Sequence, residues 1–598
     1  MVRAMQAPFA DLRGYIHALR ARGEILDIHC EVDPDLEMAE IHRRVIASGG
    51  PALLFHRVKG AALPAVSNLF GTSARVALAF GDEPARFVQE LASLPEKLLP
   101  PTARGLWRER GLLWKLMGTR LISVRRGPVC EIDEAPRLTG FPTTRSWDMD
   151  WGRFFTLPLV LTAPPESGPT NLGLYRMQVH ADHETGMHWQ IGKGGGFHHH
   201  AAESLGRDLP VNVHLGGPPA LMLAAIAPLP ENVPEMLLAA LVQGGSLRMA
   251  RHAATPLPFA SEAEAVLIGK VPALVRRPEG PFGDHYGYYS LQHDYPVFRV
   301  ERVLRRRDAI IPFTVVGKPR QEDFFLGDYL QELLHPLFPL VMPGVRDLWS
   351  YGETGYHALS AAVVRERYRH EAMQSAFRIL GEGQLSLTKF LLVIDQALDL
   401  RDFKQVLVHV LERADFATDL FVFSNLSMDT LDYAGPKVNE GSKGVLLGLG
   451  PARRTLLREF QGEPPRGVTV EVFAPGCLVL TGGELSADVL AGHPAFQAWP
   501  LLVWVDDARQ ASRSSMNFLW TAFTRMNPAS DLHSASARIH AGHIVREGPL
   551  LIDARMKPSY PRELFCDADT AKLVTRRWKE YFPERTPAMG DSDRAHLD

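Results

Sequence analysis

The residues best suited to acid–base chemistry lie in two neighbouring motifs. RRPEGPFGDHYGYYS (276–290) places Glu279 and Asp284 five residues apart around a Pro-Phe turn, and TNLGLYRMQVH (170–180) supplies Arg176. A guanidinium can hold one carboxylate ionised while the other exchanges a proton, so this set could run general acid–base catalysis. Glu-Gly-Pro is also ordinary turn chemistry, which leaves a surface turn as the alternative.

Two further features could bind an anion or a hard metal ion. GMHWQIGKGGGFHHH (186–200) contains Lys193 and a glycine triplet, whose ammonium and backbone N–H groups could hold a phosphate. The alternative for this motif is a flexible turn. Asn171 and Glu235 offer only oxygen ligands, which suit magnesium or manganese better than zinc.

The histidine run His198–His200 resembles a metal site but does not predict one. Consecutive residues on a strand point to opposite faces, so three of them cannot converge on one ion. The chain also lacks HExxH, the pattern of a zinc protease. We expect these histidines in a loop, with one of them a candidate for a pocket wall.

Bulk properties exclude several classes. With 598 residues the chain exceeds a single core, so three or four domains are expected. A net charge of −3 and the lack of a basic stripe argue against a nucleic-acid partner. No apolar run reaches membrane-spanning length, although peripheral membrane contact stays open. Four scattered cysteines form no CxxC pair, which fits a reducing cytoplasm: Cys30, Cys130, Cys477 and Cys566.

The patterns predict an α/β chain (α+β multidomain). Residues 1–130 form an N-terminal α/β domain that opens with a helix and a strand across 9–32. Residues 131–325 alternate short strands with glycine-rich turns, which indicates a barrel. The expected strands are 211–215, 265–271, 297–304 and 310–317, and the expected helices lie near 218–226 and 233–243.

The C-terminal half has βαβ texture and predicts a parallel sheet within residues 326–460. Its expected elements are a helix at 368–380, a strand at 389–395, a helix at 402–413 and a strand at 419–424. Residues 501–532 can be laid on 391–420, so the extension 461–598 either repeats the βαβ unit or only resembles it. We expect this tail to fold as α/β and to pack on 391–424, on another subunit or over the pocket mouth.

The ordered motifs NLGLYRMQ, GMHWQIGKGGG, PEGPFGDHYGYYS and VVGKPRQEDFFLG resemble the UbiD family of decarboxylases over about residues 10–445. The resemblance implies a central split β-barrel of flavin-reductase type. It also implies prenylated FMN as cofactor, held with Mn2+ (or Mg2+) and in many members K+.

The resemblance assigns roles to individual residues. The catalytic trio falls on Glu279, Arg176 and Asp284. The metal ligands fall on Asn171 and Glu235, with His188 as candidate third ligand. The cofactor contacts fall on Leu174, Tyr175, Arg176, His188, Trp189, Gln190, Lys193, Gly194 and Lys443.

Two departures from the family pattern concern the C-terminal half. The family's GSKMG(I/L)DAT appears as GSKGVLLGLG (441–450), which keeps Lys443 and loses the aspartate. GPLLIDARMKP (548–558) keeps Ile-Asp-Ala and lacks that lysine. Which of these two segments closes over the active site stays open.

The resemblance implies the non-oxidative loss of CO2 from an aromatic or α,β-unsaturated acid, with the cofactor as electron sink. Arg176 would grip the substrate carboxylate, and Asp284 would protonate the carbon that CO2 leaves. Candidate substrates are prenylated 4-hydroxybenzoate and a naphthoate, both of quinone biosynthesis, and a small phenolic acid. The competing classes are a split-barrel FMN oxidoreductase and a non-catalytic subunit.

The expected partners follow from the same resemblance. A flavin prenyltransferase would supply the cofactor, and copies of the chain would form a homo-oligomer. The expected location is the cytoplasm, with peripheral contact to the inner membrane as an open alternative.

Overall fold

The structure is a computed structural model that describes residues 7–591 except 101, 190, 191, 193, 230–233 and 319. The chain forms two compact units. The first comprises residues up to Leu333 and the segment from Arg562 onward, and the second comprises Leu334–Pro561. The expected extension 461–598 is thus divided, since its last part joins the first unit. The other domain boundaries stay predictions.

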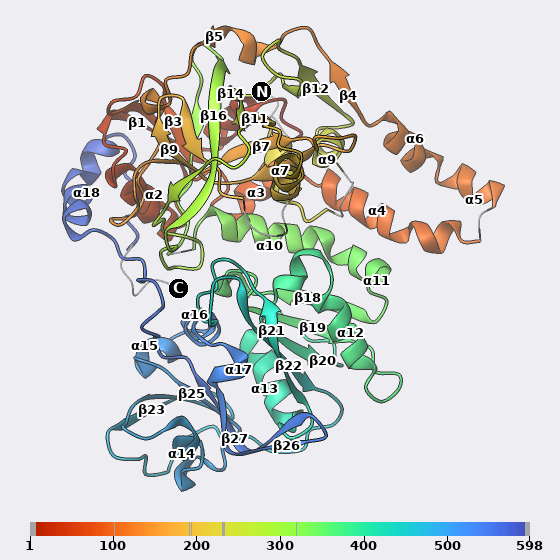
Figure 1. The fold of residues 1–598 in the computed structure, drawn as a ribbon, viewed down its shortest axis with the longest axis vertical. Coiled ribbons are helices and arrows are strands. Elements are labelled where there is room, and N and C mark those ends of the chain that lie inside the picture. Colours follow the sequence, from red (N-terminus) through yellow and green to blue (C-terminus); the bar gives the residue numbers. More distant parts are fainter. Residues whose placement is uncertain are drawn as a thin grey trace. The chain divides into compact units, whose positions relative to one another are not determined.

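The N-terminal elements and one later strand build a four-stranded sheet in the order β1-β2-β3-β17. Figure 1 labels β1 and β3 of this sheet. The expected helix and strand across 9–32 are confirmed as α1 and β1. The helix begins after Asp11, whose side chain accepts a hydrogen bond from Gly14 N. Of the expected strand 310–317, only Ile311 and Pro312 pair with β3, because Pro312 has no N–H to continue the ladder. The elements are α1 (Leu12–Ala21), β1 (Ile25–Val32), α2 (Glu37–Ala47), β2 (Ala52–Val58), β3 (Ala65–Ser67) and β17 (Ile311–Pro312).

A helical segment follows this sheet and leads to a small three-stranded sheet of order β13-β12-β4. The helices are α3 (Ser73–Phe80), α4 (Glu83–Leu98), α5 (Ala103–Arg108) and α6 (Arg110–Gly118). The strands are β4 (Arg120–Ser123), β12 (Ser246–Ala250) and β13 (Phe259–Ala260).

A ten-stranded antiparallel sheet forms the centre of the first unit, with β6-β9-β10-β16-β14-β11-β7-β8 as its main order. β8 and β9 lie near opposite ends of this order, yet only Tyr175 and Arg176 separate them in the chain. A flat sheet cannot satisfy both facts, so the sheet curls until its ends approach, as in a split barrel. The expected barrel is therefore confirmed.

Buried side chains from opposite walls fill this barrel, among them Val160, Val213, Leu267 and Phe298. The expected strands 211–215, 265–271 and 297–304 lie within three barrel strands. The barrel strands are β5 (Ile132–Glu134), β6 (Phe154–Phe155), β7 (Pro158–Thr162), β8 (Asn171–Leu174), β9 (Met177–Ala181), β10 (Glu184–Gly186), β11 (Leu209–Leu215), β14 (Ala265–Val271), β15 (Arg276–Glu279) and β16 (His293–Arg305).

Helices cover the barrel and connect it to the second unit. The two short helices expected in the barrel region are confirmed as α8 and α9. The helices are α7 (Gly194–Ser204), α8 (Pro219–Ile226), α9 (Glu235–Val242) and α10 (Glu322–Leu334). From the far end of the chain, α18 (Ala568–Tyr581) returns and packs beside α2.

The first half of the second unit is a five-stranded sheet of order β18-β19-β20-β22-β21. It contains the four elements expected between 368 and 424. They are β18 (Val345–Ser350), β19 (Leu359–Val364), α12 (Glu371–Leu380), β20 (Phe390–Ile394), α13 (Phe403–Arg413), β21 (Leu420–Ser427) and β22 (Glu440–Gly448), after the short α11 (Phe338–Val341).

The second half of this unit repeats the first. Its sheet has the order β23-β24-β25-β27-β26, and its successive pairs have the same senses: antiparallel, parallel, parallel, antiparallel. The duplicated βαβ unit is therefore present. It comprises β23 (Val468–Ala474), β24 (Cys477–Gly482), α14 (Ala487–Ala491), β25 (Leu501–Trp504), α15 (Ala508–Ser512), α16 (Ser515–Arg525), α17 (Pro528–Asp531), β26 (Leu532–His540) and β27 (His543–Asp553).

The strand registers relate the two divided motifs of the sequence. Val393 pairs with Leu447 in the first copy, and Trp504 pairs with Asp553 at the same place in the second. Leu447 and Asp553 are thus equivalent, and the residues four positions before them, Lys443 and Pro549, are equivalent as well. The first copy thus keeps the family lysine where the second has Pro549, and the second keeps the family aspartate where the first has Leu447.

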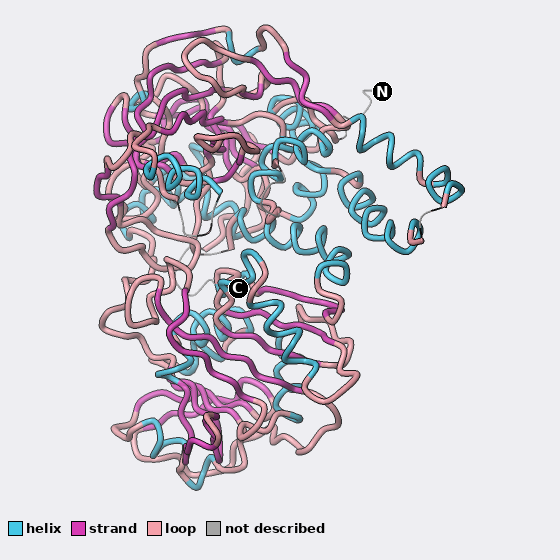
Figure 2. The backbone as a smooth tube through the Cα atoms, turned by 45° about the vertical axis from the view of Figure 1, so that its right-hand side comes forward, coloured by secondary structure: helices cyan, strands magenta, loops and turns pink. Residues whose placement is uncertain are grey.

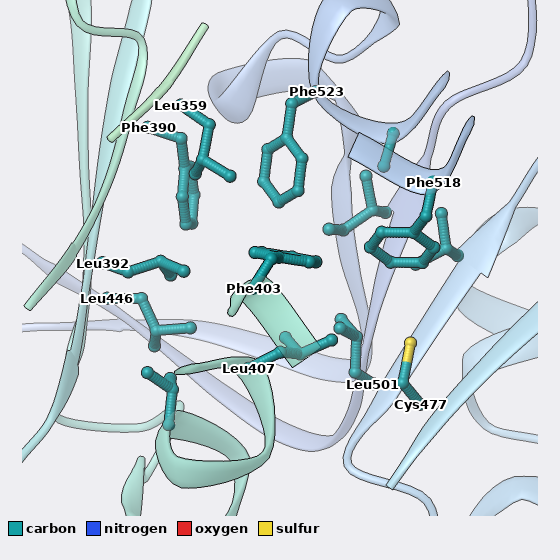
Figure 3. Packing of buried hydrophobic residues seen from close by; sticks show 14 of the residues in the cluster. Leu359, Phe390, Leu392, Phe403, Leu407, Leu446, Cys477, Leu501, Phe518 and Phe523 are labelled. Atoms are coloured by element: carbon teal, nitrogen blue, oxygen red, sulfur yellow. The ribbon is translucent and has the colours of Figure 1, made fainter. Parts of the chain in front are cut away.

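One hydrophobic core joins the two copies, as Figure 3 shows. Phe403 lies at its centre, with ring centroids 5.8 Å from Phe518 and 6.2 Å from Phe523. Leu392 and Leu446 of the first copy face it from the other side (Figure 3). The tail therefore packs on the 391–424 region, as expected, and is not a loose extension.

We predict that Phe403→Ala destabilises the second unit by about 3–5 kcal/mol, because it removes a ring that both copies contact. Phe377→Ala serves as a matched control, since that ring is exposed. Urea unfolding of the full chain, followed through the unfolding transition of the second unit, measures both. Equal effects of the two substitutions would contradict a shared core.

Candidate active site

The barrel seam positions the arginine of the candidate catalytic trio. Arg176 follows β8 directly and precedes β9, where the two ends of the curled sheet approach each other. Its guanidinium carbon lies 4.5 Å from the centroid of the Phe282 ring, which supports its flat face. The seam thereby fixes a charged group that is only 9% exposed.

Arg176 joins the two carboxylates that the sequence predicted as its partners. Its Nε donates to Glu279 Oε1 at 3.0 Å, and its Nη1 donates to Asp284 Oδ2. A third donor, Nη2, reaches Ser290 Oγ at 3.3 Å. Two motifs, whose contacting residues are up to 114 positions apart, therefore meet at one guanidinium.

Glu279 is held as an anion. Burial by itself would raise its pKa, but the charges of Arg176 and His188 outweigh burial and lower the pKa to about 2. His188 Nδ1 lies 3.1 Å from Glu279 Oε1, and the His188 ring lies against Tyr295 at 4.3 Å between centroids. Glu279 can therefore hold Arg176 in place at any ordinary pH.

Asp284 lies on a turn built by backbone hydrogen bonds. Its Oδ1 accepts from His285 N at 2.7 Å and lies 2.8 Å from His285 Nδ1. Gly280 begins the turn with φ +89°, where a Cβ would come within 3.1 Å of Leu291 O. Buried Asp150 accepts from Gly283 N at 2.7 Å and so fixes the middle of the turn.

The segment Arg562–Leu564, near the end of the chain, supports the same turn. No sequence signal indicated this support. Tyr289 N donates to Arg562 O at 2.9 Å, and Leu564 N donates to Gly287 O at 3.0 Å. Between them Glu563 pairs with Lys318, which is buried. Such a distant segment has no local pattern, so only the folded chain reveals it.

The predicted metal ligands also come together. Asn171 Nδ2 donates to Glu235 Oε1 at 2.8 Å, and Leu172 N donates to Glu235 Oε2 at 3.0 Å. Burial raises the pKa of Glu235. A carboxylate and an amide oxygen here form a hard donor pair, which fits Mn2+ or Mg2+. Among the described residues no three His, Cys, Asp or Glu side chains converge as a complete metal site.

The glycines at the start of α7 press against this pair. A Cβ on Gly194 would come within 2.7 Å of Asn171 Cγ, and one on Gly195 within 2.6 Å of Trp189 Nε1. Gly195 N also donates to Tyr175 OH at 3.4 Å. A helix N-terminus that only glycine permits, beside two oxygen ligands, fits a phosphate bound together with a metal ion.

The remaining predicted residues have different outcomes. Leu174 ends β8 in the barrel wall, whereas Gln190 and Lys193 lie outside the described residues. Lys443 belongs to the second unit, where its Nζ donates to Thr388 O at 2.8 Å and burial lowers its pKa to about 8. Its role as a cofactor contact stays a prediction.

The expectation of a loop for His198–His200 is wrong, because these residues lie on α7. The preceding glycines begin a helix instead of a flexible turn. His198 Nδ1 lies 2.8 Å from Thr162 Oγ1 of the barrel wall, so this histidine anchors the helix.

A split barrel with a phosphate-type cradle defines a flavin-binding class, and the buried Arg-Glu-Asp trio suits proton delivery. Family comparisons agree with this class. The UbiD models, described as 3-octaprenyl-4-hydroxybenzoate carboxy-lyase domains, match as the N-terminal domain (16–94), the Rift-related domain (120–319) and the C-terminal domain (324–448). The chain belongs to the UbiD family and is a carboxy-lyase.

Two similar proteins match this chain over nearly the whole length of both sequences. A Chlamydia pneumoniae protein that is named as one component of a 4-hydroxybenzoate decarboxylase is 47% identical over 579 residues, covering 96% of this chain and 99% of its own. An uncharacterised protein of Chlamydia trachomatis is 48% identical over 96% of this chain and 100% of its own. The duplicated C-terminal unit is therefore within the length that these relatives share.

Solved structures share the fold. Vanillic acid decarboxylase of Sedimentibacter hydroxybenzoicus has a TM-score of 0.66 at 23% identity, over 77% of this chain and 96% of its own. The UbiD-class enzyme HmfF of Pelotomaculum thermopropionicum, in complex with FMN, has a TM-score of 0.61 at 24% identity, over 74% and 95%.

We predict that Glu563→Ala destabilises the first unit by about 3–5 kcal/mol, because it leaves the Lys318 ammonium buried without this carboxylate. It should also speed amide hydrogen exchange in residues 284–290. The double variant Lys318→Met/Glu563→Leu, which removes both charges, is the matched control and should recover most of the loss. Unchanged exchange at 284–290 in the single variant would show that the tail does not hold the turn.

Proposed function

We propose that the protein removes CO2 from a 4-hydroxybenzoate-type aromatic acid with prenylated FMN, as a step of quinone biosynthesis. The observation that carries this proposal is the buried guanidinium of Arg176 between an anionic Glu279 and Asp284. The family description and the name of the Chlamydia pneumoniae relative both concern a 4-hydroxybenzoate ring, which supports this substrate class.

In this proposal Arg176 orients the substrate. A guanidinium has five N–H donors, and the three described bonds leave two for a planar carboxylate. Glu279 stays ionised and keeps the guanidinium in position. The substrate carboxylate therefore meets one fixed cation inside the barrel.

Asp284 supplies the proton. The overall change, R–COO⁻ + H⁺ → R–H + CO2, breaks one carbon–carbon bond and forms one carbon–hydrogen bond at the same carbon. Asp284 transfers its proton to that carbon, and solvent restores the proton. His285, 2.8 Å away, is placed to hold the carboxyl oriented between turnovers.

Asn171 and Glu235 would hold the metal ion, with Mn2+ or Mg2+ as the fitting choices and K+ as a further ion in the same region. The N-terminus of α7, with Gly194, would hold the cofactor phosphate, and Tyr175 and Trp189 would line the adjacent wall. When bound, prenylated FMN supplies the electron sink that no side chain offers. His188 is proposed as a cofactor contact or as the third metal ligand, with its Nδ1 held 3.1 Å from Glu279 Oε1.

The partners of this activity are proposed on the same basis. A flavin prenyltransferase must supply the cofactor, and the chain is proposed to act as a homo-oligomer. A direct test is co-expression with such a prenyltransferase, followed by CO2 release from 4-hydroxybenzoate, its 3-prenyl derivatives, a hydroxynaphthoate and a small phenolic acid such as 3,4-dihydroxybenzoate. CO2 release from none of these acids by flavin-loaded protein would reject the proposal.

We predict that Asp284→Asn retains bound flavin and lowers turnover by roughly 10²–10⁴-fold, because an amide cannot donate the acid proton. Asp294→Asn is the control, since Asp294 is exposed on β16. Steady-state CO2 release and flavin absorbance give the two readouts. Turnover within threefold of wild type would remove Asp284 from this role.

We predict that Asn171→Ala and Glu235→Ala each lower metal and flavin content together, because both residues would hold the ion that binds the phosphate. Asn171→Asp keeps an oxygen ligand and should retain both. Metal analysis and flavin absorbance of the purified variants measure the contents. Loss of metal with full retention of flavin would contradict a shared site.

A further inference from the structure

A helical arm extends from the first unit in both views of the chain (Figures 1 and 2). It consists of α4, α5 and α6. Lys115 of α6 pairs with Glu83 of α4, and its ammonium lies 5.4 Å from the centroid of the Phe87 ring. Among the α6 side chains that the structure describes, Leu112 is buried. These contacts fix one side of the arm and leave the other side outward.

The outward side carries large apolar side chains. Trp107 is 69% exposed, Trp114 is 70% exposed and Met117 is 68% exposed. Leu99, at the turn after α4, is 69% exposed. The next most exposed tryptophan among the described residues is Trp151, at 53%. Four such side chains on one projecting element exceed the scattered apolar exposure that water-facing surfaces normally show.

The outer part of the arm, which comprises α5 and α6, is basic, although the whole chain has a net charge of −3 and α4 carries Glu83, Glu90 and Glu96 against Arg86 and Lys97. Residues 104–120 contain one acidic residue, Glu109, and five basic residues: Arg104, Arg108, Arg110, Lys115 and Arg120. The guanidinium carbon of Arg110 lies 4.6 Å from the centroid of the Trp107 ring. Arginines therefore flank Trp107 on both sides in the outer part of the arm.

This combination distinguishes between two occupants. Two copies of the outer helices α5 and α6 that met each other about a two-fold axis would bring like charges together, which opposes pairing. An anionic lipid surface attracts lysine and arginine, and the indole ring is at home at the boundary between headgroups and acyl chains. Short helices with tryptophan, leucine and arginine lie in that boundary without crossing the bilayer. No helix of the described residues is long and apolar enough to cross one.

We infer that the outer part of the arm, helices α5 and α6, docks the protein on an anionic lipid surface. Trp107, Trp114 and Met117 insert at the headgroup boundary, and Arg104, Arg108 and Arg110 contact the lipid phosphates. The inference stands on the arm alone and does not depend on the proposed substrate. It places the carboxy-lyase beside a membrane, where an acid with a long apolar substituent would dissolve.

The test is co-sedimentation of the full chain with two kinds of vesicle. One is phosphatidylcholine alone, and the other contains about 30% phosphatidylglycerol, which makes its surface strongly negative. Wild type should bind the anionic vesicles and lose binding as salt rises. Trp107→Ser/Trp114→Ser should lower the bound fraction at least fivefold, and Arg104→Glu/Arg108→Glu should do the same. Trp151→Ser, a matched exposed tryptophan, should bind as wild type.

Circular dichroism and sedimentation velocity of each variant separate docking from misfolding and from self-association. Wild type that stays in the supernatant at low salt would overturn the inference. So would arm variants that bind vesicles as well as wild type. If wild type does not bind vesicles and an arm variant has a different oligomeric mass from wild type, the arm binds a second copy of the chain instead.

Discussion

The structure of the candidate active site depends on one buried arginine. Arg176 lies at the seam where the ends of the curled sheet meet, and it carries a charge into a region from which water is largely excluded. A buried cation is costly unless it is paired, and here Glu279 provides the compensating anion with a pKa of about 2. The barrel, the turn at 280–290 and the returning tail can each be understood as parts that hold this ion cluster together.

Much of the site could be predicted from the sequence because its motifs are long and local. The carboxylates of PEGPFGD and the arginine of LGLYRMQ have chemistry that is visible without a fold, and the structure brings them onto one guanidinium. Asn171 and Glu235 were the weaker prediction, since two oxygen ligands 64 residues apart carry little pattern, yet they also meet.

The parts that escaped sequence reasoning rest on tertiary contacts. The strand-like apolar run 310–317 pairs over only two residues, because Pro312 ends its ladder. His198–His200 became helical because the glycine triplet before them starts α7 against Asn171 and Trp189. The tail segment Arg562–Leu564 has no motif at all, and its backbone supports the Asp284 turn only after the chain has folded.

The duplicated C-terminal unit was an open question in the sequence because βαβ units share the same hydrophobic texture. Strand order and pairing sense decide it, since chance similarity would not reproduce four pairings in the same order. The copies have diverged at two positions of these strands, because the first keeps Lys443 and the second keeps Asp553, four residues further along the equivalent strand. The second copy lacks the lysine of the family motif, so its sequence points to a packing role on the shared core.

The central claim is that this trio delivers a proton to the carbon that CO2 leaves. Protein co-expressed with a flavin prenyltransferase, incubated with 4-hydroxybenzoate and its 3-prenyl derivative in D2O, tests it through mass spectrometry of the product. The account predicts a phenol that carries a single deuterium at the carbon that bore the carboxylate, formed without NAD(P)H. An unchanged acid, or a product formed only while NAD(P)H is consumed, would contradict it.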